Sequence, residues 1–132
     1  MSKELYWLTL TVLMTAMFWV PYILNRFVEM GTFAAIMNPN TDSTPRALWA
    51  KRMMAAHHNA VENLVVFAPL VLIVQITGTH SSITASATSI YFFARLIHYV
   101  VYSLGVPALR TVAFLVGFAC QIALVLTILQ FI

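Results

Sequence analysis

Two stretches of the chain carry residues whose types and spacing could do chemistry. In the first, Arg52, Asn59 and Glu62 lie seven and three residues apart, so they share one face of a helix, with His58 beside them. The stretch runs directly into the apolar segment L-V-V-F-A-P-L-V-L-I-V. Ionisable groups this close to hydrocarbon are costly and usually functional. We therefore expect this face to line a site.

The second stretch repeats the pattern. Tyr91, Arg95, His98 and Tyr102 follow one another at spacings of four, three and four, again one helical face. Arg110 follows Tyr102 by eight residues, at the start of the next apolar segment. Two polar faces on consecutive apolar segments are expected to face each other instead of lipid, which requires a scaffold of packed helices.

The composition identifies that scaffold as membrane-embedded. The 132 residues are 61% hydrophobic and 8% charged, and the mean hydropathy is +0.88, whereas a soluble domain is about 25% charged. The length suits one domain. The net charge of +3 includes no basic run, so no nucleic-acid partner is expected. The single cysteine, Cys120, lies in an apolar run and reads as a small buried hydrophobe.

Hydropathy and turn signals predict an all-α, integral membrane four-helix bundle with spans at about 5–27, 45–76, 82–103 and 108–132. Pro21 should kink the first span. Thr44 and Pro45 should cap and begin the second, after a connection that carries turn signals at Asn38, Pro39 and Asn40.

Basic residues gather on one side of these spans. That side holds Arg26, Arg46, Lys51, Arg52 and Arg110, and only Lys3 lies clearly on the other. The positive-inside rule then puts both termini outside and the polar residues toward the cytoplasm.

The helical rise sets the expected depth of the polar groups. Glu62 and Arg95 lie at matching height on antiparallel helices, at about 20 Å from the shared turn, and are expected to form a buried ion pair. Asn59 matches His98 in the same way. These groups are expected to line a pocket with Arg52 and Arg110 at its mouth. Such a pocket would suit an anionic, water-soluble ligand that meets a lipophilic one.

Other interpretations of these residues stay open. The stripes could be a polar core that fixes helix register. His58 and Glu62, four residues apart, could share a metal, but no third ligand is evident, so no metal site is assigned. A proton relay through Glu62 and His98 is a third possibility.

At these residues the chain resembles the MAPEG family, the membrane-associated proteins of eicosanoid and glutathione metabolism. A-H-H-N-A-V-E-N-L resembles the second-helix motif of the family, and F-F-A-R-L-I-H-Y-V-V-Y, followed by a glycine, a proline and Arg110, resembles its third-helix motif. V-P-Y-I-L-N-R resembles bacterial members, so a bacterial inner membrane is the expected location.

The resemblance implies a homotrimer that binds glutathione as cosubstrate between subunits near the cytoplasmic face. It implies a catalytic Arg110 beside the sulfur. The implied binding residues are Arg52, His58, Asn59, Glu62, Arg95, His98 and Tyr102. The chain departs from the family at two positions. The eicosanoid enzymes have an arginine at the position of Ala55, for which the neutral His57 and His58 are poor substitutes, and Asn63 stands where some members have tyrosine.

Two functional hypotheses follow. The first is a glutathione-dependent membrane transferase or peroxidase that acts on lipophilic electrophiles arriving through the lipid. The alternative is a non-enzymatic subunit of the same fold in a larger membrane complex, which the alanine at position 55 favours.

Overall fold

The structure is a computed structural model that describes residues 1–37 and 44–132, and the regular elements in these ranges are all helices. They are α1 (Lys3–Met17), α2 (Val20–Met30), α3 (Thr32–Met37), α4 (Leu48–Thr77), α5 (Ser82–Leu104) and α6 (Pro107–Ile128). The expected turn at Asn38, Pro39 and Asn40 lies outside the described residues. The all-α fold is confirmed.

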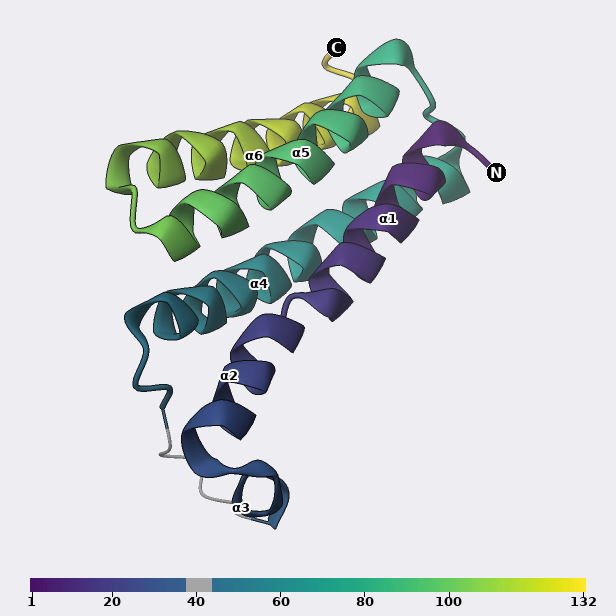
Figure 1. Ribbon diagram of the computed structural model, residues 1–132. Helices are drawn as coiled ribbons and strands as arrows, with labels where there is room; N and C mark the ends of the chain where they lie inside the picture. Colours follow the sequence, from purple (N-terminus) through teal and green to yellow (C-terminus); the bar gives the residue numbers. More distant parts are fainter. Residues whose placement is uncertain (38–43) are drawn as a thin grey trace.

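The long helices lie side by side and alternate in direction (Figure 1). α2 continues roughly where α1 ends, and α5 packs most extensively on α6 and then on α4. Both termini and the turn at 78–81 lie at one end of the bundle. The α5–α6 turn and the start of α4 lie at the other, which we call the pocket end (Figure 1).

The first span is broken where Pro21 predicts a kink. α1 ends at Met17 and α2 begins at Val20. Proline has no N–H to donate to the carbonyl of Met17, so the helical ladder loses a bond there. The carbonyl of Phe18, left at the break, accepts a 2.8 Å hydrogen bond from the Tyr99 hydroxyl. The Phe18 and Tyr99 rings also stack, with centroids 3.7 Å apart.

The expected start of the second span at Pro45 is wrong, because α4 begins at Leu48. The side chain that satisfies the free amides before it comes from α2: the Glu29 carboxylate accepts from the backbone N–H groups of Arg46 and Ala47 at 2.9 to 3.0 Å. An acidic side chain near a helix N-terminus also complements the helix dipole. α4 then continues through Pro69.

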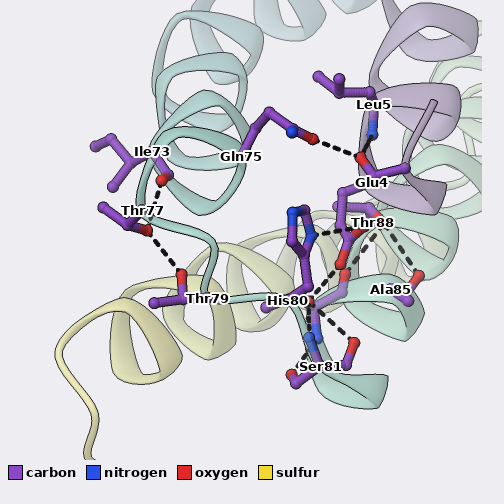
Figure 2. Close-up of polar contacts among 12 residues, drawn as sticks. Glu4, Leu5, Ile73, Gln75, Thr77, Thr79, His80, Ser81, Ala85 and Thr88 are labelled. Atoms are coloured by element: carbon purple, nitrogen blue, oxygen red, sulfur yellow. Dashed lines mark hydrogen bonds and ion pairs between the residues drawn. The ribbon is translucent and has the colours of Figure 1, made fainter.

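A network of polar contacts joins the helices at the end of the bundle that holds both termini. Glu4 of α1 is buried, accepts a 2.6 Å hydrogen bond from the Thr84 hydroxyl of α5, and lies 3.3 Å from His80. Ser81 and Thr84 form a capping box that starts α5. Figure 2 shows these contacts, from Gln75 and Thr77 at the end of α4 to Thr88 on α5.

The interior is small and the surface is apolar, as expected of helices in lipid. One core cluster lies in the terminal half of the bundle and consists of Leu8, Phe67, Val71, Val74, Ala87, Tyr91, Cys120 and Leu124. A second lies in the pocket half and consists of Phe18, Ala56, Ala60 and Tyr99. Outside them, large leucine, valine, isoleucine and phenylalanine side chains are exposed on every long helix.

Three helical segments in the described ranges are long and apolar enough to cross a membrane: Lys3–Met30, Leu48–Thr77 and Pro107–Ile128. α5 has 23 residues, or about 35 Å of helix, which is enough length. It is less apolar because its buried face carries Thr84, Thr88, Arg95 and His98. That α5 forms a fourth span stays a prediction.

Candidate functional site

Two adjoining hollows at the pocket end gather the polar residues of α4, α5 and α6. One has a volume of about 180 Å³ and lies between the start of α4 and the α5–α6 turn; its lining is Arg52, Tyr102, Gly105, Val106, Pro107 and Arg110. The other has a volume of about 250 Å³; its lining is Asn59, His98, Tyr102, Arg110, Thr111 and Phe114. Because both share Tyr102 and Arg110, we treat them as one pocket.

The pocket is cationic. The Arg110 guanidinium lies over the Tyr102 ring, with Cζ 4.6 Å from the ring centroid, a cation–π geometry that holds the charge in place. The Arg52 guanidinium lies against Gly105 at the α5–α6 turn. Neither arginine has an ion pair with a described carboxylate. An anion entering the pocket would therefore meet two uncompensated positive charges.

A third arginine lies behind the pocket wall. Arg95 is only 2% exposed, and its Nη2 donates a 2.5 Å hydrogen bond to Asn59 Oδ1. The same nitrogen lies 3.4 Å from His98 Nδ1, and the His98 ring meets Tyr102 edge-on at 5.6 Å. Among the described residues, Arg95 Nε and Nη1 have no hydrogen-bond partner. A buried guanidinium with unused donors leaves a site that an acceptor or an anion would stabilise.

The expected ion pair between Glu62 and Arg95 is wrong. Glu62 is exposed on the surface of the single chain, and Arg95 bonds to Asn59 instead. The reason is the rotation of α4. The helix buries Ala56 and Ala60, and Glu62 follows Ala60 by two residues, which is roughly 200° around the helix. Asn59 precedes Glu62 by three residues, so Arg95 meets α4 within one turn of the expected residue, but Glu62 points to another side of the helix.

The two adjacent histidines of α4 point apart. His57 Nδ1 lies 2.8 Å from the Tyr22 hydroxyl of α2, whereas His58 is exposed and does not line the pocket. Across the described ranges, no three histidine, cysteine, aspartate or glutamate side chains gather as metal ligands.

Sequence reasoning missed two groups of polar or aromatic residues. Thr111 and Phe114 line the pocket. Phe114 follows Arg110 by four residues and shares its helical face, so its place could have been predicted. Thr111 follows by one residue, about 100° around the helix, and carries no such signal. Asn63 and Gln121 link α4 to α6 behind the pocket: Gln121 Nε2 donates to the Asn63 carbonyl at 3.2 Å, and Asn63 Nδ2 donates to the Asn59 carbonyl at 2.9 Å.

A comparison against protein-family models identifies the family of the chain. The model of the MAPEG family matches residues 5–130, which is nearly the whole chain. The chain belongs to the MAPEG family. The match covers every pocket residue and, apart from the first two residues of α1, all the long helices. Comparisons with curated proteins and with solved structures give no match.

Membership of the MAPEG family supports, in general terms, a membrane role of the glutathione-transferase or eicosanoid-metabolism type. The sequence resemblance to the family is thus confirmed, as is a membrane location. Five residues predicted for the site lie together in the pocket: Arg52, Asn59, His98, Tyr102 and Arg110. Arg95 lies directly behind them, and His58 and Glu62 lie apart.

Proposed function

We propose that this MAPEG protein is a glutathione-dependent membrane transferase or peroxidase that acts on lipophilic electrophiles. The observation that carries the proposal is the convergence of Arg52 and Arg110 on one pocket, with Tyr102 between the two hollows. Two guanidinium groups that form no ion pair with a described carboxylate, next to apolar helices, suit a small anionic thiol peptide. A neutral lipid would leave both positive charges without a partner.

The donor set of the pocket matches glutathione at pH 7, which carries two carboxylates and an amine. Guanidinium groups bind carboxylates through paired hydrogen bonds, and Arg52 has no other described partner for them. The Asn59 amide and the Tyr102 hydroxyl can serve the peptide groups. The unused donors of Arg95, held by Asn59 just behind the wall, add a positive field that favours an anion.

Arg110 is the residue proposed to activate the sulfur. A fixed cation lowers the pKa of a nearby thiol, and the thiolate is the nucleophile. The thiol proton leaves to water, the sulfur lone pair forms a bond to the electrophilic carbon, and the leaving group departs with its electron pair. With a hydroperoxide, two glutathione thiols are oxidised to the disulfide while the peroxide is reduced to an alcohol and water. The chain supplies charge and proximity.

We further propose that a homotrimer completes the site. Both hollows are open at the surface of the chain, so one chain leaves a bound tripeptide partly uncovered. Glu62 is exposed on a helix with Val61, Val65 and Val66, where lipid would be a costly neighbour for a carboxylate. A neighbouring chain would bring such a carboxylate to the amine of glutathione. The pocket end would then face the cytoplasm.

The test is the ionisation of bound glutathione. Purified protein should shift the thiolate absorbance of added glutathione, because the thiol pKa falls below its usual value of about 8.5. Arg110→Ala should abolish the shift and lower kcat/KM toward standard electrophiles roughly 100-fold or more, as for the loss of one charge-stabilising donor. The measurement is a difference spectrum over a pH series, paired with steady-state rates.

Lys51→Ala is the matched control, because Lys51 is an exposed cation on the same helix as Arg52 and does not line the pocket. It should leave both the spectrum and the rates unchanged. Wild-type protein that produces no thiolate signal at saturating glutathione would rule out the proposal.

The non-enzymatic alternative keeps one specific observation in its favour. Position 55 is half-buried and carries a methyl group, so no guanidinium reaches the ligand from that turn of α4. If the protein is a non-enzymatic subunit, the pocket would bind no substrate and the exposed face of α4 would bind another membrane subunit. Co-purification with a stoichiometric partner, together with no turnover of standard electrophiles, would favour this alternative over the enzyme.

A further inference from the structure

The helices α4 and α5 end alike, but the space around their last residues differs. Each helix ends at a glycine in the left-handed conformation: Gly78 has φ +69° and ψ 18°, and Gly105 has φ +77° and ψ 32°. A left-handed C-cap is an ordinary reason for glycine. At Gly78 it is the whole reason, because a Cβ there would meet nothing within 4 Å.

At Gly105 there is a second reason. A Cβ there would overlap the Arg52 guanidinium, and the three nearest atoms are Nη1, Cζ and Nη2 of that one side chain. The planar head of Arg52, not its aliphatic stem, therefore occupies the space that a side chain at position 105 would take. Arg52 comes from the start of α4 and reaches across to the α5–α6 turn.

Little else holds that guanidinium in place. No hydrogen bond or ion pair joins it to another described residue. It lines the same hollow as Arg110 and Tyr102, and α5 ends directly beside it. The C-terminal end of a helix attracts a cation, which draws Arg52 toward the turn once the space is open.

We propose that Gly105 is a positioning residue that admits the Arg52 guanidinium to the pocket, where Arg52 binds a carboxylate of the ligand. Arg110 is then left to the sulfur. The assignment of a carboxylate rests on the glutathione site proposed above. The positioning of Arg52 by Gly105 does not.

Gly105→Ala separates this role from backbone strain when it is compared with Gly78→Ala. Both variants place a Cβ on a left-handed backbone and should lose similar stability. Only Gly105→Ala displaces Arg52, and the head of a flexible side chain can move aside without unfolding the protein. Gly105→Asn serves as a second variant, because asparagine tolerates this conformation while carrying a Cβ.

The first measurement does not use glutathione. Phenylglyoxal, which reacts with accessible guanidinium groups, is added to intact protein in detergent, and the labelling rate of each arginine is read by peptide mass spectrometry. Arg52 should react severalfold faster in Gly105→Ala and Gly105→Asn than in wild type or Gly78→Ala, with exposed Arg46 as the internal reference. An unchanged Arg52 rate in both Gly105 variants would overturn the positioning role.

The second measurement is glutathione affinity in a double-mutant cycle. Gly105→Ala should weaken binding roughly tenfold, which is the loss of about one charge-assisted hydrogen bond, and so should Arg52→Ala. In the Arg52→Ala background, Gly105→Ala should add nothing beyond the effect of Gly78→Ala. Additive losses would contradict the carboxylate role. Wild-type protein that does not bind glutathione would refute the proposed function while the labelling result still decides the positioning.

Discussion

At the scale of single residues, Arg95 is the buried cation that most needs a hydrogen-bond acceptor. It is buried in the middle of the bundle, and its Nη2 has Asn59 Oδ1 as its close acceptor. Asn59 therefore has two roles, since it also lines the pocket. A polar group that satisfies a buried cation and also faces a ligand links stability to binding at one position.

Asn59→Ala should expose this link. Removing the amide leaves the Arg95 guanidinium without its acceptor, so the variant should lose about 1.5 to 3 kcal/mol, the range for hydrogen bonds to charged groups. Thermal unfolding in detergent measures the loss, and glutathione should offset part of it if its carboxylate approaches Arg95.

Val65→Ala provides the comparison, because Val65 is 68% exposed on the same helix. Equal melting temperatures for the two variants would mean that the bond between Arg95 and Asn59 contributes nothing measurable.

The site residues could be predicted from the sequence where helical spacing alone decides their position. Arg95, His98 and Tyr102 lie on one face of one helix, so their grouping follows from the 3.6-residue period. Glu62 was placed wrongly because two faces of α4 are both plausible at the sequence level. Only the packing of Ala56 and Ala60 against neighbouring helices decides which face is buried.

At the scale of elements, the break between α1 and α2 shows how tertiary contacts complete a local signal. Pro21 predicts the interruption, but the sequence does not reveal the Tyr99 hydroxyl that satisfies the Phe18 carbonyl. The start of α4 follows the same logic, since its amides are satisfied by Glu29, which lies 17 residues before Arg46. Side chains that cap a helix from another helix cannot be found by reading the local sequence.

Tyr99→Phe tests the contribution at the break. The ring stack on Phe18 is kept and the hydroxyl is lost, so a buried carbonyl is left unsatisfied at a cost of about 1 to 3 kcal/mol. A lower melting temperature is expected, and the pocket-lining residues are untouched.

Tyr6→Phe makes the same chemical change at a side chain that is 48% exposed, and it should have almost no effect. If Tyr99→Phe melts at the wild-type temperature, the hydroxyl does not stabilise the break.

At the scale of the whole molecule, the exposed carboxylate of Glu62 is the feature that a single chain leaves unexplained. The antiparallel order of the long helices could be predicted, because long apolar runs joined by short turns allow few arrangements. The assembly could not, since nothing in a single-chain hydropathy pattern separates a surface that meets lipid from one that meets another chain.

Glu62→Leu distinguishes these two surroundings by the sign of its effect. If Glu62 meets lipid, replacing a charge with leucine should stabilise the protein. If it meets the pocket of a neighbouring chain, the substitution should weaken glutathione affinity and lower the fraction of trimer. The measurements are melting temperature, size in detergent and glutathione affinity.

Val66→Leu is the reference, because Val66 is 51% exposed on the same helix and already apolar. A Glu62→Leu protein that is more stable than wild type and binds glutathione normally would place Glu62 outside the site.

We propose that the cationic pocket at the α5–α6 turn binds glutathione in an assembly of identical chains. Native mass spectrometry of detergent-purified protein, with and without glutathione, tests it most directly because one spectrum reports both stoichiometry and ligand. We expect the mass of three chains, increased by whole glutathione masses when the peptide is added. Single chains, or trimers that gain no glutathione at any concentration tried, would contradict it.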